Sequence, residues 1–144
     1  MPLHPYIHFQ GQCAEALSFY AQVFGAPEPK MVTYAEAPGM PAGTGGGRIV
    51  HGQLEIAGGV LMASDFPPGL EGDPQQGFSV TATLPGPAEA QARFEALAEG
   101  AEVLQPFGPS FVSEGFGMLK DRFGTHWIIM VETRLQRPEL PADP

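Results

Sequence analysis

Cationic side chains and thiols are scarce in this sequence of 144 residues. Seven Lys and Arg stand against 16 Asp and Glu, which gives a formal net charge of -9 at pH 7. A surface of that sign repels phosphate backbones and anionic lipid headgroups, so we expect neither nucleic acid nor a membrane surface as a partner. The single cysteine excludes a disulfide within the chain and fits a reducing compartment.

Long apolar runs are absent as well. No run approaches the roughly 18 residues that a membrane-spanning helix needs. The first residues, MPLHPYIHF, lack the basic stretch followed by an apolar one that marks a secretory signal. The length suits one ordinary domain with a buried core. We therefore expect a single soluble domain located in the cytoplasm.

What the sequence does contain is one order of predicted elements that occurs twice. The first set has a helix over 13–24 and strands over 5–10, 30–36, 48–56 and 60–65. The second set has a helix over 87–99 and strands over 77–84, 103–107, 111–120 and 125–133. A repeated β-α-β-β-β order indicates internal duplication. Each half alone would expose one face of its sheet, so the halves must pair, within one chain or across two.

Several motifs in these elements resemble those of a known family. They are Pro5-Tyr6-Ile7-His8-Phe9, the segment 11–20, His51-Gly52-Gln53-Leu54, the strand end 61–65, and Asp121-Arg122-Phe123-Gly124-Thr125-His126-Trp127. With these motifs, over about residues 5–133, the chain resembles the PhnB-like branch of the vicinal-oxygen-chelate superfamily, which includes glyoxalase I, extradiol dioxygenases and bleomycin- and fosfomycin-resistance proteins. The branch is also labelled after 3-demethylubiquinone methyltransferase. No glycine-rich turn that would hold a methyl donor follows a strand, so we do not expect methyl transfer.

The resemblance implies an α+β fold and a homodimer. Two βαβββ modules, at about 5–65 and 77–133, would form a curled mixed sheet around a cavity within one domain, 1–135. The stretch 136–144 is polar and rich in proline, and we expect it to be a flexible tail.

The resemblance also indicates where metal-using relatives hold their ion. The first ligand position falls on His8, and the other three fall near Met62, on Phe78 or Ser79, and near Ile128. A metal at His8 would need two or three further nitrogen or oxygen donors. We therefore predict no metal and no cofactor, with His8 as a hydrogen-bonded cavity histidine. A divalent metal bound by His8 and non-standard ligands is the alternative.

Strand alternation selects further candidates for the cavity. His8 should point away from Ile7 and Phe9, which suit a face covered by a helix. His51, Gln53 and Glu55 form a polar row that faces either the cavity or solvent. If it faces the cavity, His51 and Glu55 could act as a base and its orienting carboxylate, or chelate a metal with His8. The predicted ligand-binding residues are His8, His51, Met62, Glu114, His126, Ile128 and Met130, with His8 and His51 as catalytic candidates.

Four residues have structural alternatives. Cys13 opens the first helix, where the dipole would lower the pKa of a thiol, but a small buried side chain is the interpretation we favour. Asp65 ends its strand just before Phe66-Pro67-Pro68, as a turn-capping residue does. Trp127 alternates with apolar residues and suits packing under a helix. Glu114 fits either a cavity mouth or a bulge with its carboxylate in water.

Two functions of different class follow from these residues. One is a binding protein with an apolar cavity and a few polar anchors. The other is a lyase, isomerase or dioxygenase-type enzyme, either metal-assisted or with His8 or His51 as a base. We favour binding, because three of the four implied ligand positions hold side chains that bind metals poorly. Whether the protein is catalytic, and which ligand it takes, are left open by the sequence.

Overall fold

The computed structural model describes residues 2–39, 45–111 and 113–133. The predicted tail 136–144 lies outside the described residues, as do positions 40–44 of the loop before the third strand. The chain forms two compact units. Unit 1 comprises Met1–Phe78 and Phe123–Thr125, and unit 2 comprises Ser79–Arg122 and His126–Pro144. No helix among the described residues has both the length and the apolarity needed to cross a membrane.

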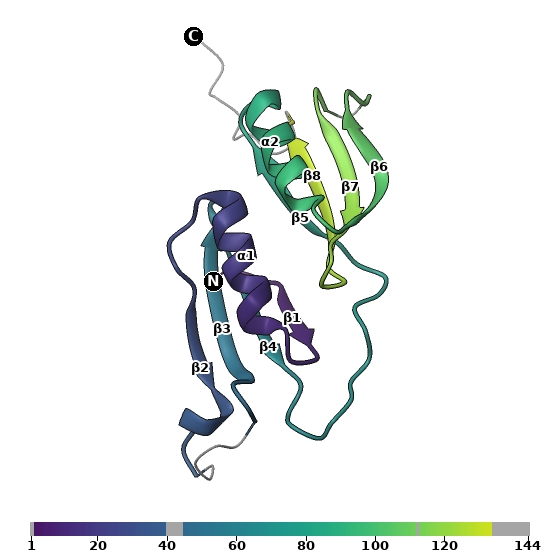
Figure 1. Cartoon of the computed structure of the whole chain (residues 1–144). Coiled ribbons are helices and arrows are strands. Elements are labelled where there is room, and N and C mark those ends of the chain that lie inside the picture. The colour runs from purple at the N-terminus through teal and green to yellow at the C-terminus, as the bar shows by residue number, and fades with distance from the viewer. Residues whose placement is uncertain (1, 40–44, 112, 134–144) are drawn as a thin grey trace. The chain divides into compact units, whose positions relative to one another are not determined.

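Unit 1 is a four-stranded sheet with one helix on one face (Figure 1). Its elements are β1 (Tyr6–Phe9), α1 (Cys13–Phe24), β2 (Lys30–Thr33), a short 3-10 helix (Tyr34–Glu36), β3 (Ile49–Ile56) and β4 (Gly59–Asp65). The strand order is β1-β4-β3-β2. The β1–β4 pair is parallel, and the other two pairs are antiparallel.

Buried apolar residues of unit 1 lie between α1 and the sheet. Ile7, Leu54 and Leu61 are almost completely buried there. Gly52 on β3 lets the helix come close, because a Cβ at this position would lie 2.7 Å from Cδ1 of Leu17. The helix ends at Gly25, whose φ of 61° is in the left-handed region that glycine adopts without strain.

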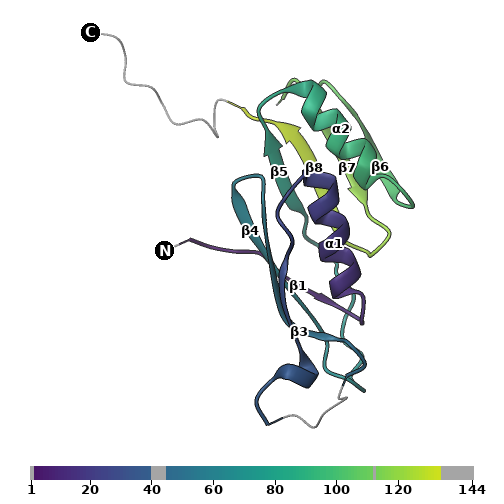
Figure 2. The same ribbon diagram turned by 60° about the vertical axis from the view of Figure 1, so that its left-hand side comes forward.

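Unit 2 repeats this arrangement with its own helix (Figure 2). Its elements are β5 (Val80–Leu84), α2 (Pro87–Leu97), β6 (Glu102–Gly108), β7 (Phe116–Lys120) and β8 (His126–Val131). The strand order is β5-β8-β7-β6, again with one parallel pair, β5–β8. Trp127, Ile129 and Ala82 are buried on the side of α2. Gly117 on β7 lets α2 come close to the sheet, as Gly52 does for α1, because a Cβ at this position would lie 2.7 Å from Cε2 of Phe94.

The α+β class and the two βαβββ modules, each with a mixed four-stranded sheet, are confirmed. Some boundaries were predicted wrongly. The strand expected over 111–120 begins only at Phe116, because the backbone N–H of Ser110 donates to the carbonyl oxygen of Ser113 at 2.9 Å and closes a turn. The strand expected over 30–36 ends at Thr33, whose hydroxyl accepts the backbone N–H of Glu36 and starts the 3-10 helix.

Candidate functional site

The predicted residues of unit 1 meet on the face of its sheet that α1 does not cover. Tyr6 and His8 alternate with Ile7 and Phe9, which are buried on the helix side. Tyr6 pairs with Met62 and His8 pairs with Ser64 along β4. Gln53 of β3 pairs with Met62 from the other side. We call this surface the strand face, and it carries Tyr6, His8, His51, Gln53, Met62 and Ser64, with Phe66 directly after β4.

Four rings stand next to one another on the strand face. The centroid of the Tyr6 ring lies 5.2 Å from that of His8 and 5.7 Å from that of His51. His8 stacks on Phe66, with 5.3 Å between centroids and 26° between ring planes. Tyr6 is 40% exposed, and His8 is exposed as well. The four rings thus form one contiguous patch, in which Tyr6 and His8 are exposed and His51 and Phe66 are half-buried.

Hydrogen bonds fix the two histidines of this patch. The Nδ1 atom of His51 lies 3.1 Å from the Tyr6 hydroxyl oxygen, and its Nε2 atom lies 3.3 Å from Oε1 of Gln53. The Nδ1 atom of His8 lies 3.2 Å from the Ser64 hydroxyl oxygen, and Ser64 is buried. Both imidazole rings are therefore held in place by neighbours on the same sheet.

Glu55 was considered as an orienting carboxylate for His51 only if the polar row faced a cavity, with a row facing solvent as the alternative. Glu55 is exposed and lies two positions beyond Gln53 on the same strand, as the alternative has it. The structure gives His51 the phenol of Tyr6 and the amide of Gln53 instead. Among the described residues, His51 is thus hydrogen-bonded to a phenol and an amide and not to a carboxylate.

The other predicted residues belong to unit 2. Ile128 and Met130 are half-buried on the face of β8 opposite Trp127 and α2. His126 lies on that same face, and its Nδ1 atom is buried without a hydrogen-bond partner among the described residues. Glu114 is exposed in the bend before β7, and not within a strand as expected. The structure therefore brings His8, His51 and Met62 together in one unit and His126, Ile128 and Met130 together in the other.

The side chains around His8 do not fit a metal ion. Its neighbours are the Tyr6 and Phe66 rings and the hydroxyl of Ser64, which offers one weak donor. Met62, at an implied ligand position, pairs with Tyr6 rather than with His8. Over residues 2–39, 45–111 and 113–133, no three His, Cys, Asp or Glu side chains gather as a metal site requires.

One buried carboxylate holds the framework of the strand face. Asp65, 1% exposed, accepts backbone N–H groups from Gly11 at 2.8 Å and Cys13 at 3.0 Å through Oδ1, and from Ile49 at 2.8 Å through Oδ2. It thereby ties the end of β4 to the start of α1 and the start of β3. The sequence suggested only a turn cap for Asp65. It could not reveal the three hydrogen bonds, because their donors lie far away in the chain.

The same arrangement makes the thiol of Cys13 inert. Burial, and secondarily the Asp65 carboxylate, raise the pKa of Cys13 from 9.0 to about 12. The thiol is fully buried, so desolvation outweighs the lowering that a helix start would cause. Burial also raises the pKa of Tyr34, whose hydroxyl donates to the backbone oxygen of Asp65. Cys13 is thus a packing residue, as the favoured interpretation had it.

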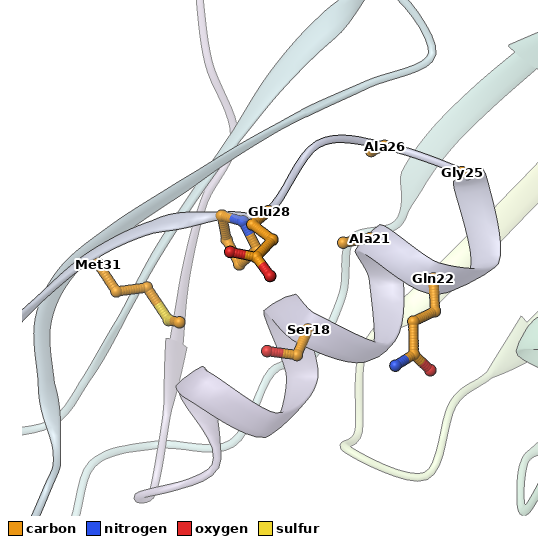
Figure 3. A pocket seen from close by; sticks show the side chains of 8 residues that line it. Ser18, Ala21, Gln22, Gly25, Ala26, Glu28 and Met31 are labelled. Atoms are coloured by element: carbon orange, nitrogen blue, oxygen red, sulfur yellow. The ribbon is translucent and has the colours of Figure 1, made fainter.

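A hollow of unit 1 lies on the helix side of the sheet. It is an open groove of about 660 Å³ between α1 and the segment that leads into β2. Figure 3 shows oxygen atoms of Glu28 and Ser18 directed into it, beside Met31. Apart from the half-buried Met31 and Pro29, the lining side chains are short or exposed, and none of the predicted site residues belongs to it.

Three residues of the strand face were not singled out from the sequence, namely Tyr6, Ser64 and Phe66. Only the parallel register of β1 with β4 brings Ser64 to His8, and only the turn after β4 brings back Phe66. Tyr6 did carry a signal, because it lies two positions before His8 and strand alternation puts both on one face.

Comparisons with known proteins agree on one family. The family model described as 3-demethylubiquinone-9 3-methyltransferase matches residues 2–130. Protein YjdN of Escherichia coli strain K12 is 29% identical over 141 residues, covering 91% of this chain and 95% of YjdN.

Solved structures extend the likeness to the fold. Protein PA1353 from Pseudomonas aeruginosa is 37% identical, with a TM-score of 0.83 over 92% of this chain and 98% of that one. A glyoxalase/bleomycin resistance protein from Albidiferax ferrireducens T118 is 13% identical, with a TM-score of 0.61 over 92% and 99% of the two chains. The second likeness concerns the fold alone.

Proposed function

The chain belongs to the 3-demethylubiquinone-9 3-methyltransferase family, the PhnB-like branch of the glyoxalase/bleomycin-resistance superfamily, and from this premise we propose that it binds a small planar molecule on its strand face. Binding proceeds without the metal ion used elsewhere in the superfamily.

One observation carries the proposal, namely the ring cluster of Tyr6, His8, His51 and Phe66, in which Tyr6 and His8 are exposed and the other two rings are half-buried. Exposed aromatic surface is unfavourable in water, and a contiguous patch of it marks a binding surface more often than a plain protein exterior. Rings that are fixed by neighbours lose little conformational freedom when a ligand stacks on them. The hydrogen bonds of His51 to Tyr6 and of His8 to Ser64 supply this fixation.

The polar atoms between the rings would orient the ligand. Small-molecule sites combine an apolar lining with a few well-placed polar groups. Here Met62 and Phe66 supply the apolar surface, while the Tyr6 hydroxyl and the two imidazoles supply the polar atoms.

Titration with 2-methoxynaphthalene, a planar probe without hydrogen-bond donors, tests the proposal. We expect shifts in the amide NMR signals of Tyr6, His8, Met62 and Phe66 on the full chain. Phe66→Ala and His8→Ala should each weaken binding at least threefold, because each removes one ring of the stack. Phe111→Ala is the matched control, since Phe111 is fully exposed and lies in unit 2. Shifts confined to Ser18 and Met31, or no shifts at all, would refute the proposal.

Metal analysis tests the alternative function. We expect the purified protein to contain no stoichiometric metal, and Ni, Zn, Mn or Fe ions to bind only weakly. One tightly bound metal per chain that disappears in His8→Ala would replace the proposal with a metal-assisted lyase, isomerase or dioxygenase-type reaction at His8.

A further inference from the structure

We infer that the strand face selects ligands that bring a hydrogen-bond donor to the Tyr6 hydroxyl oxygen, such as a phenol or an aromatic N–H. This inference rests on the proposed function, because it names the class of molecule that the same surface takes. It follows from the direction of two hydrogen bonds, one between His51 and Gln53 within β3 and one between His51 of β3 and Tyr6 of β1.

The first step concerns the bond between His51 and Gln53. The Oε1 atom of Gln53 only accepts hydrogen bonds, and it lies 3.3 Å from Nε2 of His51. The hydrogen of this bond must therefore be on Nε2. In the neutral imidazole the other ring nitrogen, Nδ1, then carries no hydrogen and is an acceptor.

The second step concerns Tyr6. Its hydroxyl oxygen lies 3.1 Å from the Nδ1 atom of His51, so the phenolic O–H donates to Nδ1. A hydroxyl has one hydrogen, and this bond uses it. What Tyr6 can still offer is the lone pairs of its oxygen. Since Tyr6 is 40% exposed, a molecule on the strand face meets this oxygen as an acceptor.

The ligand class follows from the ring surface and the acceptor oxygen of Tyr6 together. A planar body suits the rings of His8 and Phe66, and a donor at its edge suits the Tyr6 oxygen. An ether, a carbonyl or a carboxylate at the same place carries no hydrogen to donate. Its oxygen would repel the Tyr6 oxygen, and no hydrogen bond would form. Sites built around a hydrogen bond discriminate against analogues that lack the matching group.

A matched pair of probes tests the inference, namely 2-naphthol and its methyl ether, 2-methoxynaphthalene. Both are neutral at neutral pH, and the ether is the more apolar, so stacking alone favours the ether. We expect 2-naphthol to bind roughly threefold to tenfold more tightly, the range of one net hydrogen bond. In Tyr6→Phe the ratio of the two affinities should fall, because the acceptor oxygen that favours 2-naphthol is gone.

His51→Ala tests whether the preference depends on the hydrogen bond from the Tyr6 hydroxyl to His51, and not only on the presence of the Tyr6 phenol. Without His51 the Tyr6 hydroxyl can donate its own hydrogen, so the ether gains affinity and the preference for 2-naphthol falls. Melting temperatures of both variants confirm that they are folded. An unchanged preference in either folded variant would overturn the inference.

Further outcomes distinguish this inference from the proposed function. If both probes bind equally to the wild-type protein, the inference is wrong and the proposed function stands. If neither probe binds, the proposed function is wrong. Ser18→Phe narrows the groove between α1 and β2 (Figure 3), and loss of both probes in this variant would place them there and overturn both.

Discussion

The Asp65 carboxylate at the end of β4 accepts the backbone N–H of Cys13 at 3.0 Å, across 52 positions of sequence. The N–H groups of Gly11 and Ile49 also donate to this carboxylate. Three segments therefore meet at one buried charge, and the Tyr34 hydroxyl adds a bond to the backbone oxygen of Asp65. The ring cluster of the strand face begins directly beside it, at Phe66.

Replacing Asp65 by Asn should destabilise the protein by about 2–4 kcal/mol. The amide offers one acceptor oxygen where the carboxylate offers two, so at least one buried N–H loses its partner and the charge assistance is lost. The free energy of unfolding from urea titration measures the effect. Asp73→Asn is the control, because Asp73 is exposed and its substitution should change stability by less than about 0.5 kcal/mol. Equal effects of the two substitutions would contradict the role given to Asp65.

Cys13 should resist thiol reagents in the native protein. Its side chain is fully buried, and its pKa is raised to about 12, so almost no thiolate is present at pH 8. Alkylation by iodoacetamide should become fast only when urea unfolds the chain. Rapid modification of the folded protein would show that the thiol is accessible.

The same pKa predicts the sign of a pH effect on stability. In the unfolded chain the Cys13 thiol loses its proton near pH 9, whereas in the native state the thiol stays protonated up to about pH 12. Over this interval the native state binds more protons, so the free energy of unfolding should fall as pH rises. Subtracting the profile of Cys13→Ala removes the contributions of other groups. A difference profile that is flat or rises above pH 9 would contradict the assignment.

Gly52 and Gly117 should tolerate no side chain. In each unit a Cβ at this position would come 2.7 Å from a helix side chain, Leu17 in unit 1 and Phe94 in unit 2. We expect Gly52→Ala and Gly117→Ala to cost about 1–3 kcal/mol each, because the buried side chain of Leu17 or Phe94 must shift within a packed core. Thermal or urea unfolding measures the cost.

Two other strand glycines are matched controls for these substitutions. A Cβ at Gly59 would meet only a carbonyl oxygen at 3.8 Å, and a Cβ at Gly108 would meet nothing within 4 Å. Neither Gly59→Ala nor Gly108→Ala should therefore destabilise the protein measurably. Losses as large as those at Gly52 and Gly117 would show that strand conformation, and not helix approach, requires glycine.

The indole of Trp127 should report on Asp121. Its Nε1–H donates to Oδ2 of Asp121 at 2.9 Å, and both side chains are buried. Asp121→Ala leaves the indole N–H without this acceptor, so we expect a loss of about 1–3 kcal/mol and a shift of the fluorescence spectrum of the chain's single tryptophan. Asp121→Asn keeps an acceptor oxygen and should lose less. An unchanged spectrum in Asp121→Ala would contradict the bond.

Much of the fold could be predicted because it depends on local periodicity. Alternation along 5–10 and 125–133 separated helix-side residues such as Ile7 and Trp127 from His8 and Ile128. The twofold β-α-β-β-β order was visible for the same reason. The strand boundary at Phe116 could not be predicted, because a serine hydrogen-bond pattern, and not hydrophobicity, decides it.

The chemistry of the candidate site depends on pairing between distant strands. The sequence by itself determined that His8 and His51 exist in strands and that the other implied metal positions hold Met, Phe or Ser, and Ile. Only the tertiary structure decided that Tyr6 reaches across β4 to His51, 45 positions away, and that Asp65 is a buried junction. Side-chain alternation is a property of one strand, whereas the neighbour of a side chain is set by register, which no single strand encodes.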